Sequence, residues 1–365
     1  MDASSPLQTE IRRLISLTGP MPVSQYMSLC LTHPLHGYYI RRNPFGAGGD
    51  FTTAPEISQM FGELIGLWAT AVWRMMGSPE NFRFIELGPG RGTMVRDALR
   101  AMQVVPAFYR AIEIHLVEIS PVLEEVQRQT LLHSDVVVHW HRTLGDVPDG
   151  PTILVANEFL DTLPVHQAVK QPDGWHERVI GFDPLGNFVL GVARRTIPKF
   201  ERLLPATLRE APVGSIFEWR ADNIAMDIGR RVRAKGAALL IDYGHTESAF
   251  GDTLQSVSKH AFTDPLANAG MVDMTAHVDF QYFAQAAESM GASVYGPIDQ
   301  GEFLIRLGIE ARADALRANA VGQQADDINS ALLRLTQGGS DDMGRLFKAM
   351  AIADPKLGIL PGFEI

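Results

Sequence analysis

The feature that most constrains the fold is a glycine-rich turn inside FRFIELGPGRGTMVRDALR, residues 82–100. Gly88, Gly90 and Gly92 alternate in this turn, which follows the apolar run FRFIEL. After the turn, apolar residues recur at helical spacing. A buried run, a glycine turn and an amphipathic pattern in this order are typical of a parallel strand that leads into a helix.

Strand-like and helical segments alternate along the chain, which predicts an α/β fold with a doubly wound parallel sheet. Helices are expected at 92–103, 120–132 and 223–235, and strands at 82–87, 113–118, 136–140, 152–157 and 237–242. Sheets of this kind bind ligands beyond the carboxyl ends of their strands. Glu86, Glu118, Asn157 and Asp242 fall at those ends, so we expect the functional site there.

Other segments depart from this alternation. Residues 1–80 are predicted to be a helical segment whose irregular loop, NPFGAGGDFTTAPE, covers the ligand of a main domain spanning 81–365. Residues 164–215 are predicted to be an antiparallel meander inserted in that domain. Near the C-terminus we expect a helix and a strand in 277–298, one long helix over 300–319 and a last strand at 346–353.

The composition excludes several classes of protein. The formal net charge of −10 disfavours a nucleic-acid-binding protein, which normally presents a basic face. No apolar run approaches the roughly 20 residues of a bilayer-spanning helix, so stable membrane insertion is not expected. MDASSPLQTEIRRLIS has neither the apolar block of a secretory signal nor the pattern of a transit peptide, so we expect a cytoplasmic (bacterial) protein. The single cysteine excludes internal disulfides, and nothing indicates the oligomeric state.

The spacing of the glycines and the charge beside them indicate the ligand. The pattern is G-x-G-x-G rather than the dinucleotide pattern G-x-G-x-x-G, because position 93 is Thr. Glu86, just before the turn, would repel a pyrophosphate at the helix N-terminus. S-adenosylmethionine has no phosphate and carries an ammonium and a sulfonium, which a carboxylate attracts. We therefore expect this cofactor, with Gly88, Gly90 and Gly92 letting the backbone approach it closely.

Glu118 is the second carboxylate of the predicted cofactor site. It ends the strand at 113–118, where it can accept hydrogen bonds from the two ribose hydroxyls. It lies thirty residues after Gly88, whereas the NAD fingerprint expects roughly 20. The alternatives are that Glu86 and Glu118 only cap their strands, or that the chain is an NAD-dependent oxidoreductase.

Several longer stretches resemble the MidA-like family of S-adenosylmethionine-dependent methyltransferases, which includes the mitochondrial complex I assembly methyltransferase. They extend from about residue 20 to the C-terminus and read HPLHGYYIRRNPFGAGGDFTTAPEISQMFGELIGLW, ELGPGRGTM, HLVEISPVL, NEFLDTLPVHQ, LLIDYG, GDTLQSVSKH, DMTAHVDF and LFKAMAIADP. GGDFTTAPE and NEFLD are the most specific parts. The resemblance implies a class I (Rossmann-like) methyltransferase fold with added helical and β segments.

The resemblance also implies a substrate. The mitochondrial member of the family dimethylates an arginine on the complex I subunit that helps to form the quinone site. The same subunit of a bacterial complex I is therefore the expected protein partner. The alternatives are a methyltransferase for a small molecule or another protein, and a non-catalytic chaperone of complex I assembly.

Residues that could methylate arginine lie in NEFLD, 157–161. A guanidinium has a pKa above about 12, so it needs carboxylates that hold it and accept a proton. Glu158 and Asp161 are three apart, which would put them on one side of a helical turn. We expect both to hold the guanidinium, with Asp161 the better proton acceptor, unless Asp161 only caps the turn. Asn157 is expected to contact the cofactor.

Other candidates lie in the irregular loop and at the rim. Thr53 is predicted to contact the cofactor, or simply to cap the following helix. Asp50, His166 and Tyr243 are predicted to face the substrate, although His166 is equally compatible with an ordinary position in the inserted strands.

No metal site is expected. H33-P-L-H36 and H139-W-H141 each pair two histidines. Neither pair has a third ligand at helical or hairpin spacing, which a stable site would need.

Overall fold

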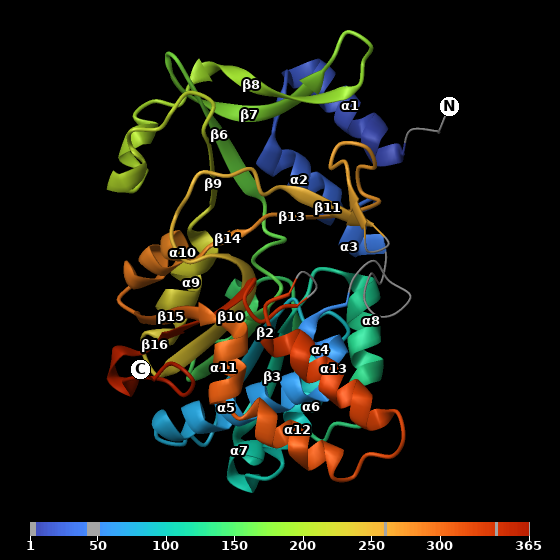
Figure 1. Cartoon of the computed structure of the whole chain (residues 1–365), viewed down its shortest axis with the longest axis vertical. Helices are drawn as coiled ribbons and strands as arrows, with labels where there is room; N and C mark the ends of the chain where they lie inside the picture. The colour runs from blue at the N-terminus through green and yellow to red at the C-terminus, as the bar shows by residue number, and fades with distance from the viewer. Residues whose placement is uncertain (1–4, 42–51, 259–260, 340–341, 365) are drawn as a thin grey trace.

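A mixed eight-stranded sheet forms the centre of the larger of two bodies in this computed structural model (Figure 1). The structure describes residues 5–41, 52–258, 261–339 and 342–364. Within them the strand order is β4-β3-β2-β5-β10-β16-β15, and β14 pairs with the end of β10. The strands are β2 (Phe82–Leu87), β3 (Ile112–Val117), β4 (Val138–His141), β5 (Thr152–Asn157), β10 (Gly236–His245), β14 (Val278–Asp279), β15 (Ser293–Asp299) and β16 (Phe347–Ala353).

The strand order reverses between β2 and β5. Strand β2 pairs in parallel with both β3 and β5, and β10 continues the sheet in parallel with β5. Strand β16 is antiparallel to both of its neighbours, β10 and β15. Connections that leave β2 and β5 run to opposite sides of the sheet, which opens a crevice beyond their carboxyl ends. The predicted class I methyltransferase fold is confirmed.

Helices cover both faces of the large sheet, because successive strand residues point to opposite faces. Phe84 belongs to the core under α5, α6 and α11–α13, and Ile85 to the core under α9 and α10. The helices are α5 (Gln59–Met75), α6 (Thr93–Met102), α7 (Pro106–Ala111), α8 (Pro121–Thr130), α9 (Asn223–Val232), α10 (Phe280–Glu288), α11 (Gln300–Arg306), α12 (Ile309–Arg317) and α13 (Gln324–Thr336).

The single helix predicted over 300–319 is wrong. The chain forms α11 and α12, separated at Leu307 and Gly308. Gly308 has a φ of +91°, in the left-handed region that glycine adopts without a steric penalty. The helical pattern of apolar residues continues across this glycine, so periodicity alone did not reveal the break.

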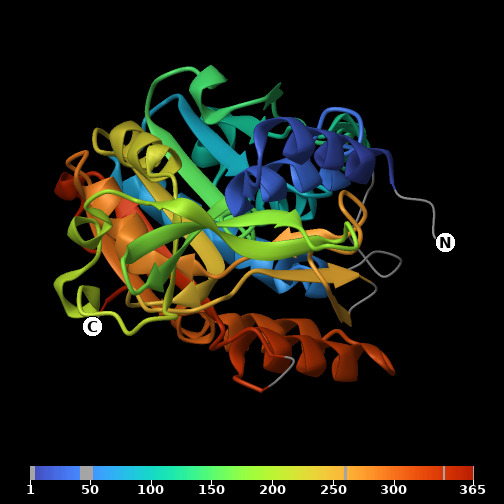
Figure 2. The same cartoon turned by 90° about the horizontal axis from the view of Figure 1, so that it is seen from above.

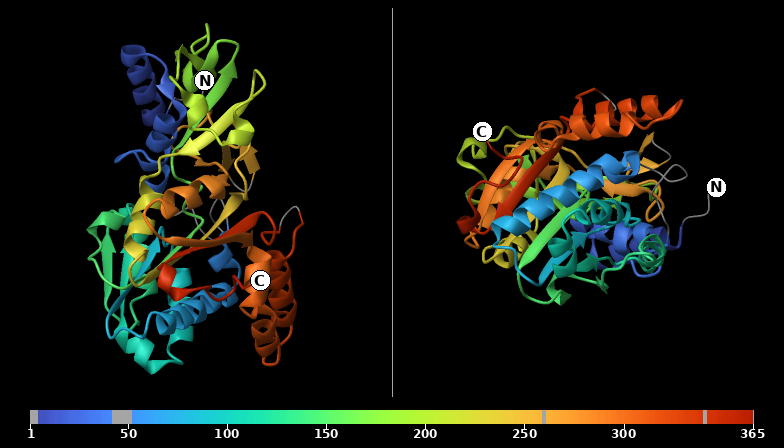
Figure 3. Two further views of the ribbon diagram at one scale, coloured as in Figure 1. Left: turned by 90° about the vertical axis from the view of Figure 1, so that its left-hand side faces the viewer. Right: turned by 90° about the horizontal axis from the view of Figure 1, so that it is seen from below.

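The smaller body is an antiparallel sheet covered by N-terminal helices (Figures 2 and 3). Its order is β1-β7-β6-β9, with β8 also paired to β7. Helices α1 (Pro6–Thr18) and α2 (Val23–Thr32) pack on it around a core that contains Met27, Val165 and Ile180. The strands are β1 (Met21–Pro22), β6 (Val165–Gln171), β7 (Gly174–Phe182), β8 (Phe188–Thr196) and β9 (Ile216–Arg220), with a separate sheet of β11 (Gln255–Ser258), β12 (Ala261–Thr263) and β13 (Asp273–Thr275).

The packing divides the N-terminal segment between the two bodies. Helix α3 (Tyr38–Arg41) joins α1 and α2 in the smaller body, whereas α4 (Ala54–Ile57) and α5 pack on the larger one. The domain boundary at residue 80 and the limits of the insertion remain predictions. Among the described residues, no helix combines the length and the hydropathy that a bilayer span requires.

Candidate active site

The glycine turn after β2 has the left-handed backbone that its sequence suggests. Gly88, Gly90 and Gly92 have φ angles of +61°, +54° and +77°, which residues with a side chain adopt only at a cost. A Cβ atom at Gly88 would also lie 2.8 Å from Cδ2 of Phe159. Gly92 is the N-cap residue of α6. The turn therefore requires glycine both for its conformation and for the close approach of Phe159.

A cavity of about 290 Å³ lies beside this turn, with walls from both bodies. The larger body contributes the ends of β2 and β3 and the loop after β4, and the smaller one contributes α2 and Tyr39. Much of the lining is apolar, and Glu118 contributes a carboxylate to it. The apolar part of the lining includes Leu87, Val117, Ile119, Leu123, Leu144 and Phe159.

Glu118 is fixed by a network that the sequence did not predict. Its Oε1 accepts a hydrogen bond from the backbone N–H of Ser120 at 2.7 Å, and its Oε2 accepts one from Gln127 Nε2 at 3.0 Å. Burial raises the pKa of Glu118 to about 6. The same Gln127 amide donates to the carbonyl of Gly90 at 2.8 Å, and its oxygen accepts from Trp140 Nε1 at 3.0 Å. Gln127 thus joins the glycine turn, the Glu118 carboxylate and β4.

A second, smaller cavity of about 30 Å³ also borders the glycine turn. Glu86 and Asn157 both line it, and both are buried. Within the part of the chain that the structure describes, neither Glu86 Oε2 nor Asn157 Oδ1 has a hydrogen-bond partner. Burial raises the pKa of Glu86 to about 8. Buried acceptors without partners are costly, so these two oxygens are suited to a ligand that donates hydrogen bonds.

These features fit S-adenosylmethionine. Gly88, Gly90 and Glu158 line both cavities, so both lie against the glycine turn. The apolar cavity with Glu118 suits an adenosine, whose ribose hydroxyls can donate to the carboxylate. The free oxygens of Glu86 and Asn157 suit the ammonium, which has three N–H donors.

The end of the irregular loop, residues 53–56, lies against the glycine turn and the turn after β5. The backbone N–H of Ala54 donates to Glu158 Oε1 at 2.8 Å. Glu56 accepts hydrogen bonds from Thr93 Oγ1 and, at 3.1 Å, from Arg91 Nη1. Thr53 is the N-cap residue of α4, but its side chain makes no capping bond; it is buried and lines the smaller cavity. Asp50 lies outside the described residues.

The turn after β5 is not helical, and an aspartate from β10 shapes it. Asp242 Oδ2 accepts the backbone N–H groups of Phe159, Leu160 and Asp161 at 3.1, 2.8 and 3.2 Å. Glu158 has a φ of +51° at the start of this turn. Asp242 is one of the strand-end residues around which the functional site was expected, and the structure buries it beneath the turn, where it binds the backbone.

The two predicted catalytic carboxylates face different surroundings. Glu158 lines both cavities, and its Oε1 accepts from Ala54 N and, at 3.1 Å, from Asn157 Nδ2. Asp161 is buried and does not line either cavity. Burial raises the pKa of Glu158 to about 7 and that of Asp161 to about 6. The expectation that one side of a helical turn presents both carboxylates is wrong, because the turn is held by Asp242 and is not helical.

Asp161 lies instead among groups from the junction of the two bodies. Its side chain hydrogen-bonds to Tyr243, which follows Asp242 on β10. Arg220, at the end of β9, donates to the carbonyl oxygens of Asp161 and Ala276 at 3.2 and 2.6 Å. The positive charge of this buried arginine offsets the negative charge of Asp161.

His166 lies in the smaller body, away from the residues that line the two cavities. Its Nδ1 is 3.2 Å from Ser24 Oγ and 3.4 Å from Glu177 Oε1, and its ring stacks on Trp219 with centroids 5.1 Å apart. This is the ordinary strand position that the sequence left open. By contrast Tyr39, which the sequence analysis missed, lines the larger cavity and donates to Asp273 Oδ1 at 2.8 Å.

The two histidine pairs have different surroundings. His33 stacks on His36 and lies 3.2 Å from Glu10 Oε2. The pair on β4 acquires neighbours from β3, because His115 pairs in register with His139. Strand β3 therefore brings a third imidazole, that of His115, next to this pair.

The fold and the two cavities define a class I S-adenosylmethionine-dependent methyltransferase. The chain belongs to the family of putative S-adenosyl-L-methionine-dependent methyltransferases, whose model matches residues 64–298. The family resemblance and the cofactor expected from the sequence are thereby confirmed.

Among curated relatives, the mitochondrial protein arginine methyltransferase NDUFAF7 homolog of Drosophila melanogaster is 37% identical over 379 residues, covering 95% of this chain and 84% of the relative. Human mitochondrial protein arginine methyltransferase NDUFAF7 is 37% identical over 347 residues, covering 86% of this chain and 76% of the relative. A solved structure of a likely methyltransferase of the COG1565 superfamily from Burkholderia thailandensis, bound to S-adenosyl-homocysteine, is similar with a TM-score of 0.86. It is 29% identical and covers 99% of this chain and 95% of its own.

Proposed function

We propose that this chain is a protein-arginine N-methyltransferase that acts on the quinone-site subunit of respiratory complex I during assembly. The relatives named protein arginine methyltransferases support arginine as the methylated side chain, and the MidA-like resemblance supports the complex I subunit. The observation that carries the proposal is the partly buried carboxylate of Glu158, which lines both cavities.

The surroundings of Glu158 suit the proton chemistry of arginine. S-adenosylmethionine, when bound, supplies an electrophilic methyl group on a sulfonium. A guanidinium has a pKa above about 12 and must be aligned and lose a proton. Burial raises the pKa of Glu158 to about 7, so its carboxylate can accept a proton near neutral pH. Ala54 and Asn157 occupy Oε1, and we assign Oε2 to the guanidinium.

Asp161 is assigned a positioning role. It does not line the cavities, so Glu158 is a better proton acceptor than Asp161, contrary to the expectation from the sequence. The hydrogen bond between Asp161 and Tyr243 would fix the orientation of both side chains. Tyr243, which was predicted to face the substrate, does not line either cavity. We also propose that the cofactor is bound by Glu86, Glu118, Asn157, Thr53 and the three glycines of the turn.

Glu158→Gln tests the catalytic assignment, because the amide oxygen can still accept from Ala54 and Asn157. We expect methyl transfer to a recombinant quinone-site subunit to fall at least about 100-fold, with the affinity for S-adenosylhomocysteine within about threefold of that of the parent. Glu310→Gln, at an exposed position on α12, is the matched control. The parent rate should rise with pH through about 7. Full activity of the Glu158 variant would refute the assignment.

The substrate is tested separately, by mass spectrometry of the quinone-site subunit from cells with and without the gene. We expect arginine methylation to be lost with the gene. An unchanged methylation state would refute this substrate and leave a small molecule or another protein as the acceptor. If the Glu158 variant supported complex I assembly without methylating the subunit, the chain would act as a chaperone. The cytoplasmic location stays a prediction.

A further inference from the structure

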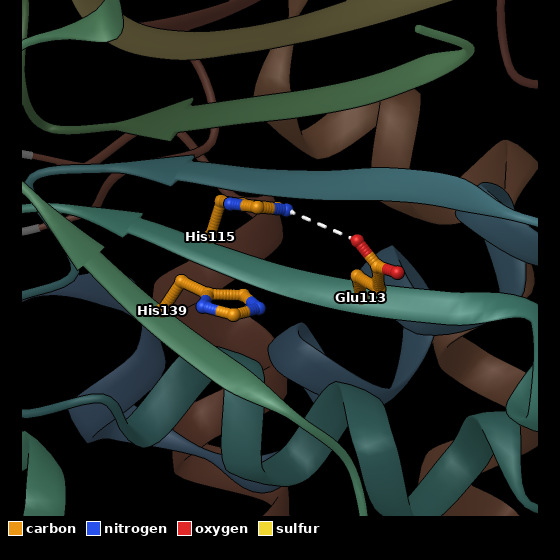
Figure 4. A group of neighbouring side chains, drawn as sticks. All are labelled: Glu113, His115 and His139. Carbon is orange, nitrogen blue, oxygen red and sulfur yellow. Dashed lines mark ion pairs between the residues drawn. The ribbon is translucent and has the colours of Figure 1, made fainter. Parts of the chain in front are cut away.

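Glu113, His115 and His139 form a cluster on one face of the large sheet, outside the two cavities described above (Figure 4). Glu113 and His115 lie two apart on β3, so their side chains share a face. His139 lies opposite His115 on the neighbouring strand β4, and His141 follows two residues later. Parallel pairing therefore brings three histidines and one glutamate to the same side of the sheet edge.

The spacing of the ligand atoms in this cluster is compatible with a metal ion. One ligand atom from each of Glu113, His115 and His139 lies within 4.8 Å of the others. His115 Nε2 and Glu113 Oε2 are 3.7 Å apart, which is too long for a hydrogen bond. Ligands at about 2.1 Å from a tetrahedral Zn²⁺ lie roughly 3.4 Å from each other. Small side-chain rotations of Glu113 and the exposed His139 would bring the ligand atoms from their present separations to the spacing expected around Zn²⁺.

The buried histidine is available as a ligand. The side chain of His115 is only 3% exposed, yet its Nε2 has no hydrogen-bond partner among the described residues. As Figure 4 shows, this nitrogen points toward the Glu113 carboxylate. A buried ring nitrogen without a partner is costly, and an ion between His115 and Glu113 would satisfy it.

His141 supplies the outer partner that metal-binding histidines usually have. Its Nε2 lies 2.9 Å from His115 Nδ1. When His115 Nδ1 carries the hydrogen and donates it to His141, the lone pair of His115 Nε2 is directed toward Glu113. The cluster thus contains both the ligands and the hydrogen bond that orients the central one.

We propose that Glu113, His115 and His139 bind one divalent transition-metal ion of the Zn²⁺ class, with solvent completing the coordination. Imidazole nitrogens favour Zn²⁺ over Mg²⁺ or Ca²⁺. Because the ligands come from both strands, the ion would fasten the edge strand β4 to β3. This site is independent of the proposed methyl-transfer chemistry.

Calorimetric titration of the metal-free full chain, without an affinity tag, with ZnCl₂ tests the proposal. We expect saturation at one ion per chain and no binding of MgCl₂. His139→Ala and Glu113→Gln should each weaken the Zn²⁺ affinity at least about tenfold. His133→Ala is the control, because His133 is exposed and lies outside the cluster. Absence of Zn²⁺ binding, or equal affinity in the parent and both ligand variants, would overturn the proposal.

A spectroscopic measurement on the parent and on folded variants tests the ligands directly. Replacement of the buried His115 could unfold the chain, so the two ligand variants are at exposed or partly exposed positions, and circular dichroism confirms that they fold. Co²⁺ added to the parent should give the visible absorption bands of a low-symmetry site with nitrogen and oxygen ligands. These bands should be lost in His139→Ala and retained in His133→Ala. Bands of equal intensity in both variants would place the ion elsewhere and refute the assignment.

Discussion

Replacing Glu86 by Gln should stabilise the cofactor-free protein at alkaline pH while it weakens cofactor binding. Glu86 is 3% exposed, and its Oε2 has no hydrogen-bond partner. Burial of this carboxyl group raises its pKa from the ordinary 4.5 to about 8. The charge that would bind the cofactor ammonium is therefore unfavourable for the stability of the empty site.

The direction in which stability changes with pH follows from proton binding to Glu86. Between about pH 5 and pH 8, Glu86 is protonated in the folded chain and ionised in the unfolded chain. The free energy of unfolding therefore falls by about 1.4 kcal/mol for each pH unit across this window. The complete shift corresponds to roughly 5 kcal/mol. A buried amide with imperfect hydrogen bonds costs about 1–3 kcal/mol, so Glu86→Gln should be more stable than the parent by roughly 2–4 kcal/mol at pH 8.5.

Cofactor affinity should change in the opposite direction. A hydrogen bond to a charged group contributes about 1.5–3 kcal/mol, which corresponds to roughly 10- to 150-fold in the dissociation constant. Urea unfolding of the cofactor-free chain between pH 5.5 and 8.5 measures the first effect, and calorimetry with S-adenosylhomocysteine measures the second. Glu310→Gln serves as the exposed control. Identical pH profiles for the parent and Glu86→Gln, or unchanged S-adenosylhomocysteine affinity, would refute the reasoning.

Two further substitutions probe the scaffold of the site. Gly88→Ala should lower the free energy of unfolding by about 1–2 kcal/mol because of its positive φ, and by about 1–3 kcal/mol more because of the contact with Phe159. Gly77→Ala is the control, because Gly77 has a φ of +85° and nothing lies within 4 Å of the new Cβ. It should show only the cost of the positive φ. Urea unfolding measures both, and equal losses would contradict the steric argument. Gln127→Met keeps the volume but removes the three hydrogen bonds of this buried side chain. We therefore expect a loss of roughly 2–4 kcal/mol in the free energy of unfolding and S-adenosylhomocysteine binding weakened at least about tenfold. Parent-like affinity in calorimetry would show that Gln127 does not organise the site.

Much of the cofactor site could be predicted because its signals are local. The apolar segments that are predicted to be strands end at Glu86, Glu118 and Asn157. The structure places these three residues around the glycine turn. Parallel strands that end at the same edge necessarily bring such residues together. Their roles in binding remain predictions, but their proximity required no knowledge of distant contacts.

The substrate side was harder to predict. Gln127 and Tyr39 carry no local motif, and each becomes part of the site only through contacts with residues distant in sequence. Asp242 was recognised as a strand-end residue, yet its function in the turn depends on the pairing of β10 with β5. The carboxylate that faces the cavity could not be chosen from the spacing of Glu158 and Asp161, because the turn between them is not helical.

The alternation of strands and helices, the left-handed glycine turn and the acidic strand ends follow from local sequence, since backbone preference and hydrophobic period act over a few neighbouring residues. Long-range packing places Glu158 on the cavity walls and buries Asp161 at the junction of the two bodies. It also brings the histidines of β4 next to His115 and Glu113 of β3. Burial, pKa and mutual approach depend on which distant segments pack together, and no local pattern specifies that choice.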